Sequence, residues 1–501
     1  MIESERQEVT GMREWWRKAG SENLRVPVYS RVVDFEAIYR RHPPVPEFAE
    51  EMFLWPPERI EAYKNQLFME IMEVAWQNPF YQRKWAEAGI KKEDIRSIED
   101  LPKLPIVTVS DFKEAIERDP PYGLHQGVTA KDAARIPLKI QTSGGTTGRP
   151  RPTFFGPLEW EIQALQTARG LYIQGARPGD VLQVPLTLSM ANAGWVYYLA
   201  CHYYLGMVPI TPGSGVVTAS RRQLEYAEAF GTNIWASFPE YLLHLGKTAQ
   251  EMGLDLKKLP TKFITSFLGP DTEGHLRRQM EELWGCPVYD NYGTHEIGLT
   301  AFECQAKAGL HINEDMFIIE VADVETNEVL PYGQKGNLVA TSLYREHPPL
   351  IRYNLMDLVR IFPRERCDCG SWFLRMDHFL GRSDDMVKLR GTNVYPMACL
   401  NAVQSDPRTT GQWLCVVDRI TDPDGTYRDE MTVMVEYVDE SVDKEALRRD
   451  LEVRLHADLG VRVQVQPVPA GELAELTNYG RQGEGKVRRL LDRRPGYQRH
   501  Y

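Results

Sequence analysis

Short apolar runs alternate with helical stretches between residues 136 and 340, and this alternation constrains the fold most. The helical stretches include 220–230 and 271–284, and the apolar runs are VLQVPL (181–186), MVPIT (207–211), NIWASF (233–238) and FITSFLG (263–269). Runs of strand length that alternate with helices predict a parallel or mixed sheet covered by helices. Upstream, apolar residues recur at helical spacing from Ile60 to Ala75, and Asn78-Pro79 ends that helix.

The pattern changes after Gly381. The segments WLCVVDRI (413–420), MTVMVEYV (431–438) and VRVQVQPV (461–468) are typical of strands. Before the last of them, leucines recur every fourth residue, as on one face of a helix, at Leu447, Leu451, Leu455 and Leu459. We therefore predict a large α/β domain of residues 1–382 and a small α+β domain of residues 383–501. We interpret residues 1–55 as an N-terminal arm laid on the large domain.

The composition and net charge of the chain argue against some classes of binding partner. The chain has 501 residues, of which 43% are hydrophobic, so global disorder is excluded. With 59 basic and 70 acidic residues the net charge is −11, which argues against general binding to nucleic acid or anionic membranes. The N-terminus MIESERQEVT does not resemble a secretory signal, and no apolar run reaches the length of about 20 residues that spans a bilayer. We expect a cytoplasmic protein whose seven cysteines are reduced.

The strongest local motif is TSGGTTGRP, at residues 142–150. Its glycines let the backbone approach a phosphate closely, and its hydroxyl and N–H groups suit an anion. The motif lacks the Gly-Lys-Ser/Thr ending of a P-loop, and taken alone it is compatible with a surface turn. Four more segments follow it in order: DNYGTHE (290–296), IRYNLMD (351–357), GRSDDM (381–386) and GKVRR (485–489).

This ordered set resembles the adenylate-forming superfamily of acyl-CoA synthetases, luciferases and adenylation domains. Within it, the chain is most similar to the phenylacetate-CoA ligase family, through NPFYQR (78–83), LPKLP (101–105), GLHI (309–312) and RGTNVYP (390–396). The resemblance implies the fold of that superfamily, with a large N-terminal α/β domain and a small mobile C-terminal α+β domain. By analogy with the family, it also implies a homodimer.

The resemblance implies an AMP-forming carboxylic acid–CoA ligase. Such an enzyme activates a small aryl acid, or a short-chain acid with or without a hydroxyl group, with ATP and Mg²⁺, which gives acyl-AMP and pyrophosphate. It then transfers the acyl group to coenzyme A. One alternative is an adenylating enzyme that passes the acyl group to a carrier protein or an amine. Another is a non-enzymatic, zinc-stabilised nucleotide-binding protein, against which the presence of Lys486 and Glu296 speaks.

The resemblance also implies roles for individual residues. Lys486 is the candidate catalytic lysine between the attacking carboxylate and the α-phosphate, and Glu296 is the candidate Mg²⁺ ligand, because Mg²⁺ prefers oxygen. Tyr292 offers a ring face to adenine, and Asp357 can accept from both ribose hydroxyls. The phosphate loop is Ser143, Gly144, Gly145, Thr146, Thr147 and Gly148. The other nucleotide-binding candidates are Gly269, Asp290, Asn291, Tyr292, Gly293, Thr294, Asp357 and Arg382.

Asp384 matches the family's hinge, about which the small domain swings after adenylation, although a plain linker has the same composition. The swing brings Lys388, Arg390 and Gly391 to the coenzyme A route. By position, the acyl pocket is lined by Ser189, Asn192, Trp195, Trp235 and His295. The tryptophans suit an aromatic ring, whereas the polar residues suit a short or hydroxylated acid. His295 stands where the family usually has Ser or Thr, so it contacts phosphate, contacts substrate, or has no role.

Four residues make a second candidate site: Cys304, His311, Cys367 and Cys369. Three thiolates and one imidazole form a tetrahedral zinc set that leaves no open position, so its role is structural. Some proteins similar to phenylacetate-CoA ligase carry such a site. The alternative is a group of separate, reduced cysteines with a hydrogen-bonded core histidine.

Overall fold

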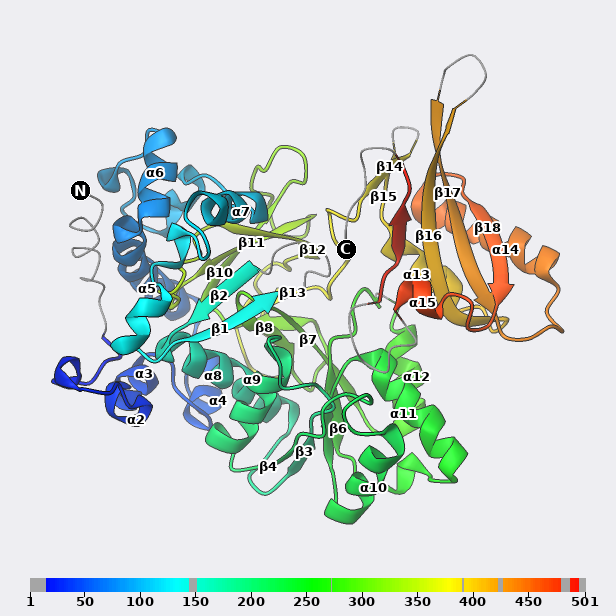
Figure 1. Ribbon diagram of the computed structural model, residues 1–501, viewed down its shortest axis with the longest axis horizontal. Coiled ribbons are helices and arrows are strands. Elements are labelled where there is room, and N and C mark those ends of the chain that lie inside the picture. The colour runs from blue at the N-terminus through cyan, green and yellow to red at the C-terminus, as the bar shows by residue number, and fades with distance from the viewer. Residues whose placement is uncertain are drawn as a thin grey trace.

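The computed structural model describes residues 15–143, 151–271, 273–389, 392–421, 427–478 and 487–494. Figure 1 shows a large lobe and, to its right, a smaller lobe built from the C-terminal part of the chain. The large lobe is centred on an eight-stranded sheet with the strand order β13-β9-β8-β7-β6-β5-β3-β4. The alternating pattern between residues 136 and 340 therefore predicted the fold class correctly.

The strands of this sheet coincide with the predicted apolar runs. The runs form β3 (Val181–Gln183), β4 (Val208–Ile210), β5 (Ile234–Ala236) and β6 (Phe263–Ser266), which are joined by β7 (Val288–Thr294), β8 (Gly298–Glu303), β9 (Leu310–Ile312) and β13 (Arg375–Met376). Strands β3 to β7 pair in parallel because helices connect them, whereas β8 pairs with β7 and with β9 in antiparallel fashion.

Helices cover both faces of this sheet. One face packs against α8 (Pro157–Gln174), α9 (Ala193–Leu199) and the π-helical turn η7 (Ala200–Tyr204), the other against α10 (Ser220–Phe230), α11 (Pro239–Met252) and α12 (His275–Trp284). Ile234 and Ala236 belong to the first core, and Trp235 between them belongs to the second. Successive strand residues point to opposite faces, so the register of β5 decides which side chains meet α8 and α9.

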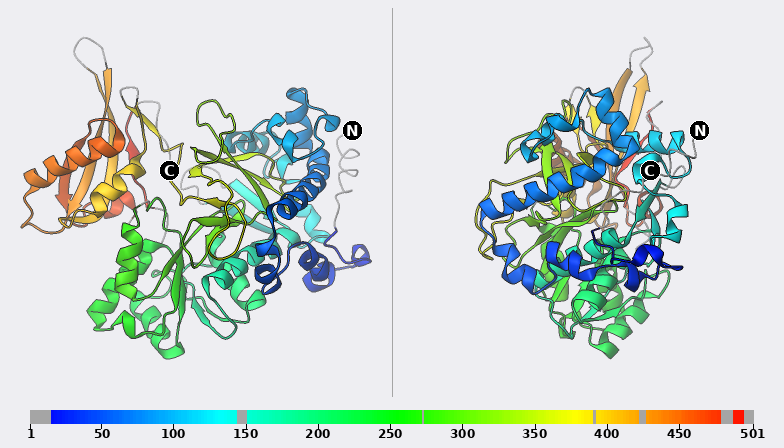
Figure 2. Two further views of the ribbon diagram at one scale, coloured as in Figure 1. Left: turned by 180° about the vertical axis from the view of Figure 1, so that it is seen from behind. Right: turned by 90° about the vertical axis from the view of Figure 1, so that its left-hand side faces the viewer.

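Two smaller sheets complete the large lobe. They are the hairpin of β1 (Lys139–Ser143) and β2 (Arg151–Phe155), and the sheet of β10 (Phe317–Ala322), β11 (Lys335–Ser342) and β12 (Tyr353–Arg360). The N-terminal helices are α2 (Tyr29–Val32), α3 (Phe35–Arg41), α4 (Glu47–Glu50), α5 (Pro57–Gln77), α6 (Pro79–Glu87) and α7 (Val109–Arg118). Figure 2 shows α5 along the outside of the lobe. Among the described helices, we find none with the length and apolarity needed to cross a membrane.

Short 3₁₀ turns link these elements. They are η1 (Ser21–Asn23), η2 (Met52–Leu54), η3 (Lys92–Asp94), η4 (Ile98–Lys103), η5 (Leu124–Gln126), η6 (Ala130–Ala134), η8 (Leu256–Lys258) and η9 (Pro396–Ala398). The break predicted at Asn78 is a capped junction, because its side-chain oxygen accepts from Phe80 N at 3.0 Å. The same amide donates to the His125 carbonyl at 3.0 Å, so it also ties α6 to η5.

The segment before residue 56 is built into the core of the large lobe. Phe48, Met52 and Phe53 are buried in one cluster with Phe302 and Phe373. The Tyr29 hydroxyl donates to Glu161 of α8 at 2.5 Å. The N-terminal arm of the sequence analysis is therefore an integral layer of the large lobe over its described part.

The small lobe has its own sheet and its own core. The sheet order is β18 (Gln464–Pro469), β17 (Tyr427–Tyr437), β16 (Thr409–Thr421) and β19 (Leu490–Asp492), with α13 (Cys399–Gln404), α14 (Lys444–Leu459) and α15 (Ala474–Thr477) beside it. The hairpin β14 (Val387–Leu389) and β15 (Thr392–Val394) joins it to the large lobe. The leucines spaced four apart on α14 are all buried, as predicted, in an apolar cluster drawn from residues 387–490.

Candidate active site and metal cluster

Three predicted nucleotide-binding residues form a chain of polar contacts: Tyr292, predicted at adenine, Asp357, predicted at the ribose, and Arg382. The Tyr292 hydroxyl donates to Asp357 Oδ2 at 2.7 Å, and Arg382 Nη1 donates to Asp357 Oδ1 at 2.8 Å. Arg382 also donates from Nε and Nη2 to the two carboxylate oxygens of Asp384, at 2.8 and 3.0 Å. Burial and the Asp357 carboxylate raise the pKa of Tyr292 well above its ordinary value, so its hydroxyl keeps its proton. One network thus links the candidate ribose site to the candidate hinge.

The side chains of Asp290 and Asn291 form hydrogen bonds with other residues of the protein. Asp290 Oδ1 accepts from the backbone N–H groups of Leu268 and Asn291, at 2.7 and 2.9 Å, and its Oδ2 lies 2.6 Å from Nδ1 of His378. The Asn291 amide donates to Thr265 Oγ1 and the Ser266 carbonyl, and it accepts from Gln174. These hydrogen bonds hold β7 beside β6, and the nucleotide-binding role of both side chains stays a prediction.

Glu296 lies in the turn between β7 and β8, where it pairs with a cation. Arg151 Nη2 donates to Glu296 Oε1 at 2.8 Å. Burial acts to raise the pKa of Glu296, but Arg151 and His295 outweigh it, so the pKa lies below its ordinary value. A carboxylate that stays ionised and already holds a positive group fits the role of Mg²⁺ ligand.

A pocket opens beside this ion pair. It lies at the junction of α7, η5, β2, the β7–β8 turn and the β11–β12 connection. Its lining residues are Phe112, His125, Gln126, Arg151, Pro152, Thr153, Glu296, Arg345, Pro348 and Leu350. Burial, with Arg151, lowers the pKa of His125 to about 3, so the imidazole is neutral at pH 7. The charged groups on the pocket wall are therefore Arg151, Glu296 and Arg345.

His295 begins a run of aromatic rings. Its ring lies 5.9 Å from Phe155, Phe155 lies 6.3 Å from Trp160, and Trp160 lies 6.2 Å from Trp195, between ring centroids. Burial, followed by Arg345 and Arg151, lowers the pKa of His295 to about 4 despite the opposing effect of Glu296. The ring is therefore neutral at pH 7, and its Nε2 is buried without a hydrogen-bond partner among the described residues.

The other predicted acyl-pocket residues separate into two groups. Asn192 is buried and donates to Gln163 of α8, while Trp195 Nε1 donates to the carbonyl of the exposed Ser189 at 2.8 Å. Trp235 instead packs against Trp284, with ring centroids 5.0 Å apart, on the face covered by α10 to α12. The prediction for Trp235 is wrong. Alternate residues of β5 point to opposite faces of the sheet, and the Trp235 ring lies on the face away from α8 and α9.

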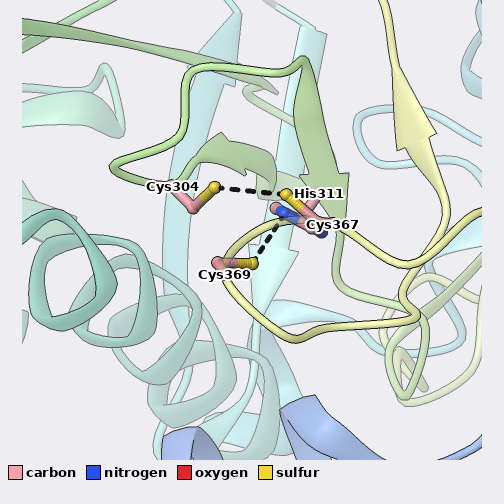
Figure 3. A group of neighbouring side chains, drawn as sticks. All are labelled: Cys304, His311, Cys367 and Cys369. Atoms are coloured by element: carbon pink, nitrogen blue, oxygen red, sulfur yellow. Dashed lines mark hydrogen bonds between the residues drawn. The ribbon is translucent and has the colours of Figure 1, made fainter.

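The four candidate zinc ligands converge from distant parts of the chain. Cys304 follows β8, His311 lies in β9, and Cys367 and Cys369 lie in the turn before β13. Their ligand atoms lie within 4.8 Å of one another (Figure 3). His311 Nε2 is 3.4 Å from Cys369 Sγ, and Cys304 Sγ is 3.8 Å from Cys367 Sγ. Three sulfur atoms and one imidazole nitrogen in a largely buried, closed group fit zinc.

The chain matches known proteins over most of its length. The model of the AMP-binding enzyme family matches residues 55–343, and that of the AMP-binding enzyme C-terminal domain matches residues 391–494. Phenylacetate-coenzyme A ligase of Thermus thermophilus is 30% identical over 468 residues, which cover 89% of this chain and 99% of the relative. The corresponding ligase of Aromatoleum evansii is 31% identical over 84% of this chain and 91% of its own. The chain belongs to the phenylacetate-CoA ligase family of AMP-binding enzymes.

Solved structures agree with this membership. A 2-hydroxyisobutyryl-CoA ligase in its postadenylation state, in complex with R3-HIB-AMP, is 26% identical to this family member, covers 91% of each chain and has a TM-score of 0.74. The same ligase in its thioesterification state, with 2-HIB-AMP and CoA, has a TM-score of 0.64 over 89% and 92% of the two chains. The chain is thus more similar overall to the postadenylation structure than to the thioesterification structure.

Several predicted residues of this AMP-binding enzyme are not placed. The positions Gly144, Gly145, Thr146, Thr147, Gly148, Arg390, Gly391 and Lys486 lie outside the described residues. Ser143 ends β1, Thr294 ends β7, Gly269 has a positive φ of 72° after β6, and Lys388 is exposed on β14. The roles of all these residues stay predictions.

Sequence reasoning missed three basic side chains near the site: Arg151, Arg345 and His378. Arg151 directly follows the glycine-rich motif, so its position was a usable signal. Arg345 and His378 lie in segments that none of the quoted motifs includes. His378 is held by Asp290, and burial opposes but does not outweigh that carboxylate, which raises the pKa of the imidazole.

Replacing Gly293 by alanine is expected to slow acyl-adenylate formation by about 10–100-fold, because a catalytic group that moves by about 1 Å can cost this much. A Cβ at this position would lie 2.4 Å from the Gly298 carbonyl oxygen, so the turn that carries Glu296 must shift. The measurement is the rate of acid-dependent exchange between ATP and pyrophosphate. Gly336→Ala is the control, since its added methyl meets the Ala322 carbonyl oxygen at 2.3 Å, a similar clash outside the β7–β8 turn. An unchanged exchange rate in Gly293→Ala would contradict the assignment of Glu296.

Proposed function

We propose that the acid activated by this AMP-forming acid–CoA ligase is a small aryl acid. The observation that carries the proposal is the run of rings from His295 through Phe155 and Trp160 to Trp195, which begins next to Glu296. Aromatic side chains favour edge and offset contacts with a further ring, so such a run suits an aryl group. The phenylacetate-coenzyme A ligase names of the curated relatives support the same choice.

The reaction has two steps. In the first, a carboxylate oxygen attacks the α-phosphorus of ATP, and pyrophosphate leaves with the electron pair of the broken bond. In the second, the thiol of coenzyme A attacks the acyl-adenylate, and AMP leaves. We assign Asp357 and Arg382 to the ribose, Glu296 to Mg²⁺ and Lys486 to the charge that develops during the first step. A bound Mg²⁺ supplies positive charge to the phosphates.

Domain alternation about Asp384 is the proposed link between the two steps. Asp384 is tied to Arg382, whose third contact is the candidate ribose carboxylate Asp357. Because Arg382 connects the hinge residue to the ribose carboxylate, the hinge is suited to respond to the nucleotide bound at that site. The different TM-scores against two states of one ligase support a movement between the lobes.

The Cys304 cluster is proposed to hold one structural zinc ion. Its closed set of four ligands offers no position for substrate, so it stabilises the connection between β9 and β13 without taking part in either step. A homodimer and a cytoplasmic location remain predictions, as does the absence of nucleic-acid and membrane partners. Size-exclusion chromatography with light scattering tests the first of these.

A short hydroxylated acid is the second candidate substrate. The observation that favours it is a pair of buried amides: Asn192 Oδ1 and Gln163 Nε2 have no hydrogen-bond partner among the described residues. A substrate hydroxyl can satisfy such groups, whereas a wholly apolar substrate leaves them unpaired at a cost of about 1–3 kcal/mol each. The 2-hydroxyisobutyryl-CoA ligase among the structural relatives fits this alternative.

A panel of aryl and short hydroxylated acids distinguishes the two candidates. We expect pyrophosphate release with and without coenzyme A to show acyl-adenylate formation for an aryl acid, and turnover only when coenzyme A is present. An adenylate that coenzyme A does not discharge would indicate a carrier protein or an amine as the acceptor. No adenylate with any acid of either class would overturn the ligase assignment.

Asn192→Leu sharpens this comparison. If the acid is an aryl one, the variant should keep kcat/KM within about threefold, because the Asn192 Oδ1 atom that it removes makes no hydrogen bond to an apolar substrate. If it is a hydroxylated acid, kcat/KM should fall by about 10–100-fold, since the hydrogen bond to the substrate hydroxyl is lost. Asn233→Leu, at a half-buried amide that donates to Asp180 at 2.8 Å, controls for loss of stability. A large loss with the aryl acid would contradict the first candidate.

A further inference from the structure

The pocket beside Glu296 contains an arginine that the predicted nucleotide-binding set does not include. Arg345 lies in the connection between β11 and β12, is fully buried, and lines the pocket together with Arg151 and Glu296. A guanidinium group has five N–H donors and does not lose its charge in proteins. Burying these donors without acceptors is costly, so each of them needs a partner.

The described residues provide hydrogen-bond acceptors for only part of the Arg345 guanidinium group. Its Nη2 donates to the Phe154 carbonyl at 3.0 Å, and its Cζ lies 4.4 Å from the centre of the Phe155 ring. Its Nε and Nη1 atoms are buried without a hydrogen-bond partner, within the described part of the chain. Arg345, a permanent cation that lines the pocket, thus has two donor atoms without an acceptor among the described residues.

The neighbouring carboxylates are engaged elsewhere. Glu296 accepts from Arg151. Glu159 accepts from three backbone N–H groups, those of Gly156, Glu346 and His347, at 2.8 to 2.9 Å. Among the described residues, no carboxylate forms an ion pair with Arg345. A buried cation in this setting indicates that the pocket receives an anion from solution.

We infer that Arg345 binds the pyrophosphate end of ATP. This inference rests on the proposed adenylation chemistry. The pocket shares its wall with Glu296, the candidate ligand of the cation that accompanies phosphates, and a second guanidinium, that of Arg151, lies on the same wall. The planar fork of a guanidinium matches phosphate oxygens in bidentate fashion. Six of the ten lining residues are polar or charged, and the two guanidinium groups among them suit phosphates better than an acyl group.

The role in the reaction follows from where charge develops. When the carboxylate attacks, the bond between the α-phosphorus and the bridging oxygen breaks, and its electron pair stays on pyrophosphate. Fixed donors of Arg345 stabilise that charge without reorganisation, since Phe154 and Phe155 already hold the group in place. The residue therefore acts on the triphosphate end of the nucleotide and makes no contact with the AMP part.

Binding measurements on Arg345→Met test this inference. With magnesium pyrophosphate, ATP and AMP as probes in calorimetry and thermal-shift assays, we expect pyrophosphate and ATP to bind about 10–100-fold more weakly, and AMP within about twofold of the unsubstituted protein. The unliganded variant should melt no lower than the unsubstituted protein, because the substitution removes a buried charge without a carboxylate partner. Arg345→Gln, which keeps a donor for the Phe154 carbonyl, should show the same loss and serves if the methionine variant does not fold.

Arg177→Met is the matched control. Its guanidinium also lies over an aromatic ring, 4.1 Å from the Tyr172 centroid, and also donates to backbone carbonyls, but it lies away from the pocket. Unchanged pyrophosphate affinity in both Arg345 variants would overturn the inference. An equal loss of affinity for pyrophosphate and for AMP, together with a lower melting temperature, would also overturn it. A variant in which only the KM of the acid rises would do the same. If the unsubstituted protein binds neither pyrophosphate nor ATP, the proposed function itself fails.

Discussion

Replacing Lys486 by alanine is expected to reduce acyl-adenylate formation by at least about 10²–10³-fold, the usual cost of removing one preorganised donor at a transition state. The lysine neutralises charge that develops as the carboxylate meets the α-phosphate, so its loss raises the barrier of the first step. Thioester formation from supplied acyl-AMP and coenzyme A should remain within about threefold. The two half-reactions are measured separately, by pyrophosphate release and by thioester formation.

Asp384→Pro should show the opposite pattern. Proline fixes φ near −65°, so it hinders a hinge movement and slows the second step while it spares the first. Because Asp384 also accepts two hydrogen bonds from Arg382, Asp384→Ala is needed to separate the loss of that pair from the restriction of φ. Lys444→Ala, at a lysine of the small lobe that pairs with Glu440, controls for a general change of charge. Equal damage to both half-reactions by Lys486→Ala and Asp384→Pro would mean a single static site.

Purified protein is expected to contain about one zinc ion per chain, and Cys367→Ser to contain none. Structural zinc contributes an apparent binding free energy of about 10–16 kcal/mol in small domains, and a substantial part of such a contribution is lost with one ligand. We expect the melting temperature to fall by about 10 °C or more, since about 1 kcal/mol shifts it by a few degrees in a domain of this size. Metal content is measured by atomic emission and stability by circular dichroism.

The position of the cluster sharpens this expectation. Cys304 directly follows β8, His311 lies on the neighbouring β9, and Cys367 and Cys369 lie in the turn before β13, so one ion cross-links three segments. Phe53 packs against the His311 ring, 5.0 Å between centroids, which connects the cluster to the N-terminal segment. Cys286→Ser is the control, because Cys286 is buried but lies outside the cluster. Purified protein that contains no zinc and has unchanged stability would contradict the zinc assignment.

The sequence by itself determined the secondary structure and the residue types of the candidate sites. Strand runs, helical spacing and breaks such as Asn78-Pro79 act locally, through burial period and backbone restrictions, so they are readable without a fold. The zinc set was also readable, because three cysteines and one histidine are few enough to suggest a single tetrahedral group.

Only the tertiary structure decided what each site residue contacts. Trp235 is a core residue because the register of β5 determines which face of the sheet its side chain occupies. A continuous run of apolar residues in the sequence does not reveal that register. Asn291 is saturated by Thr265, Ser266 and Gln174, which are 25 or more positions away in the chain. The unpaired donors of Arg345 are a property of its surroundings, and the energy of a buried charge depends on those partners and not on the residue type.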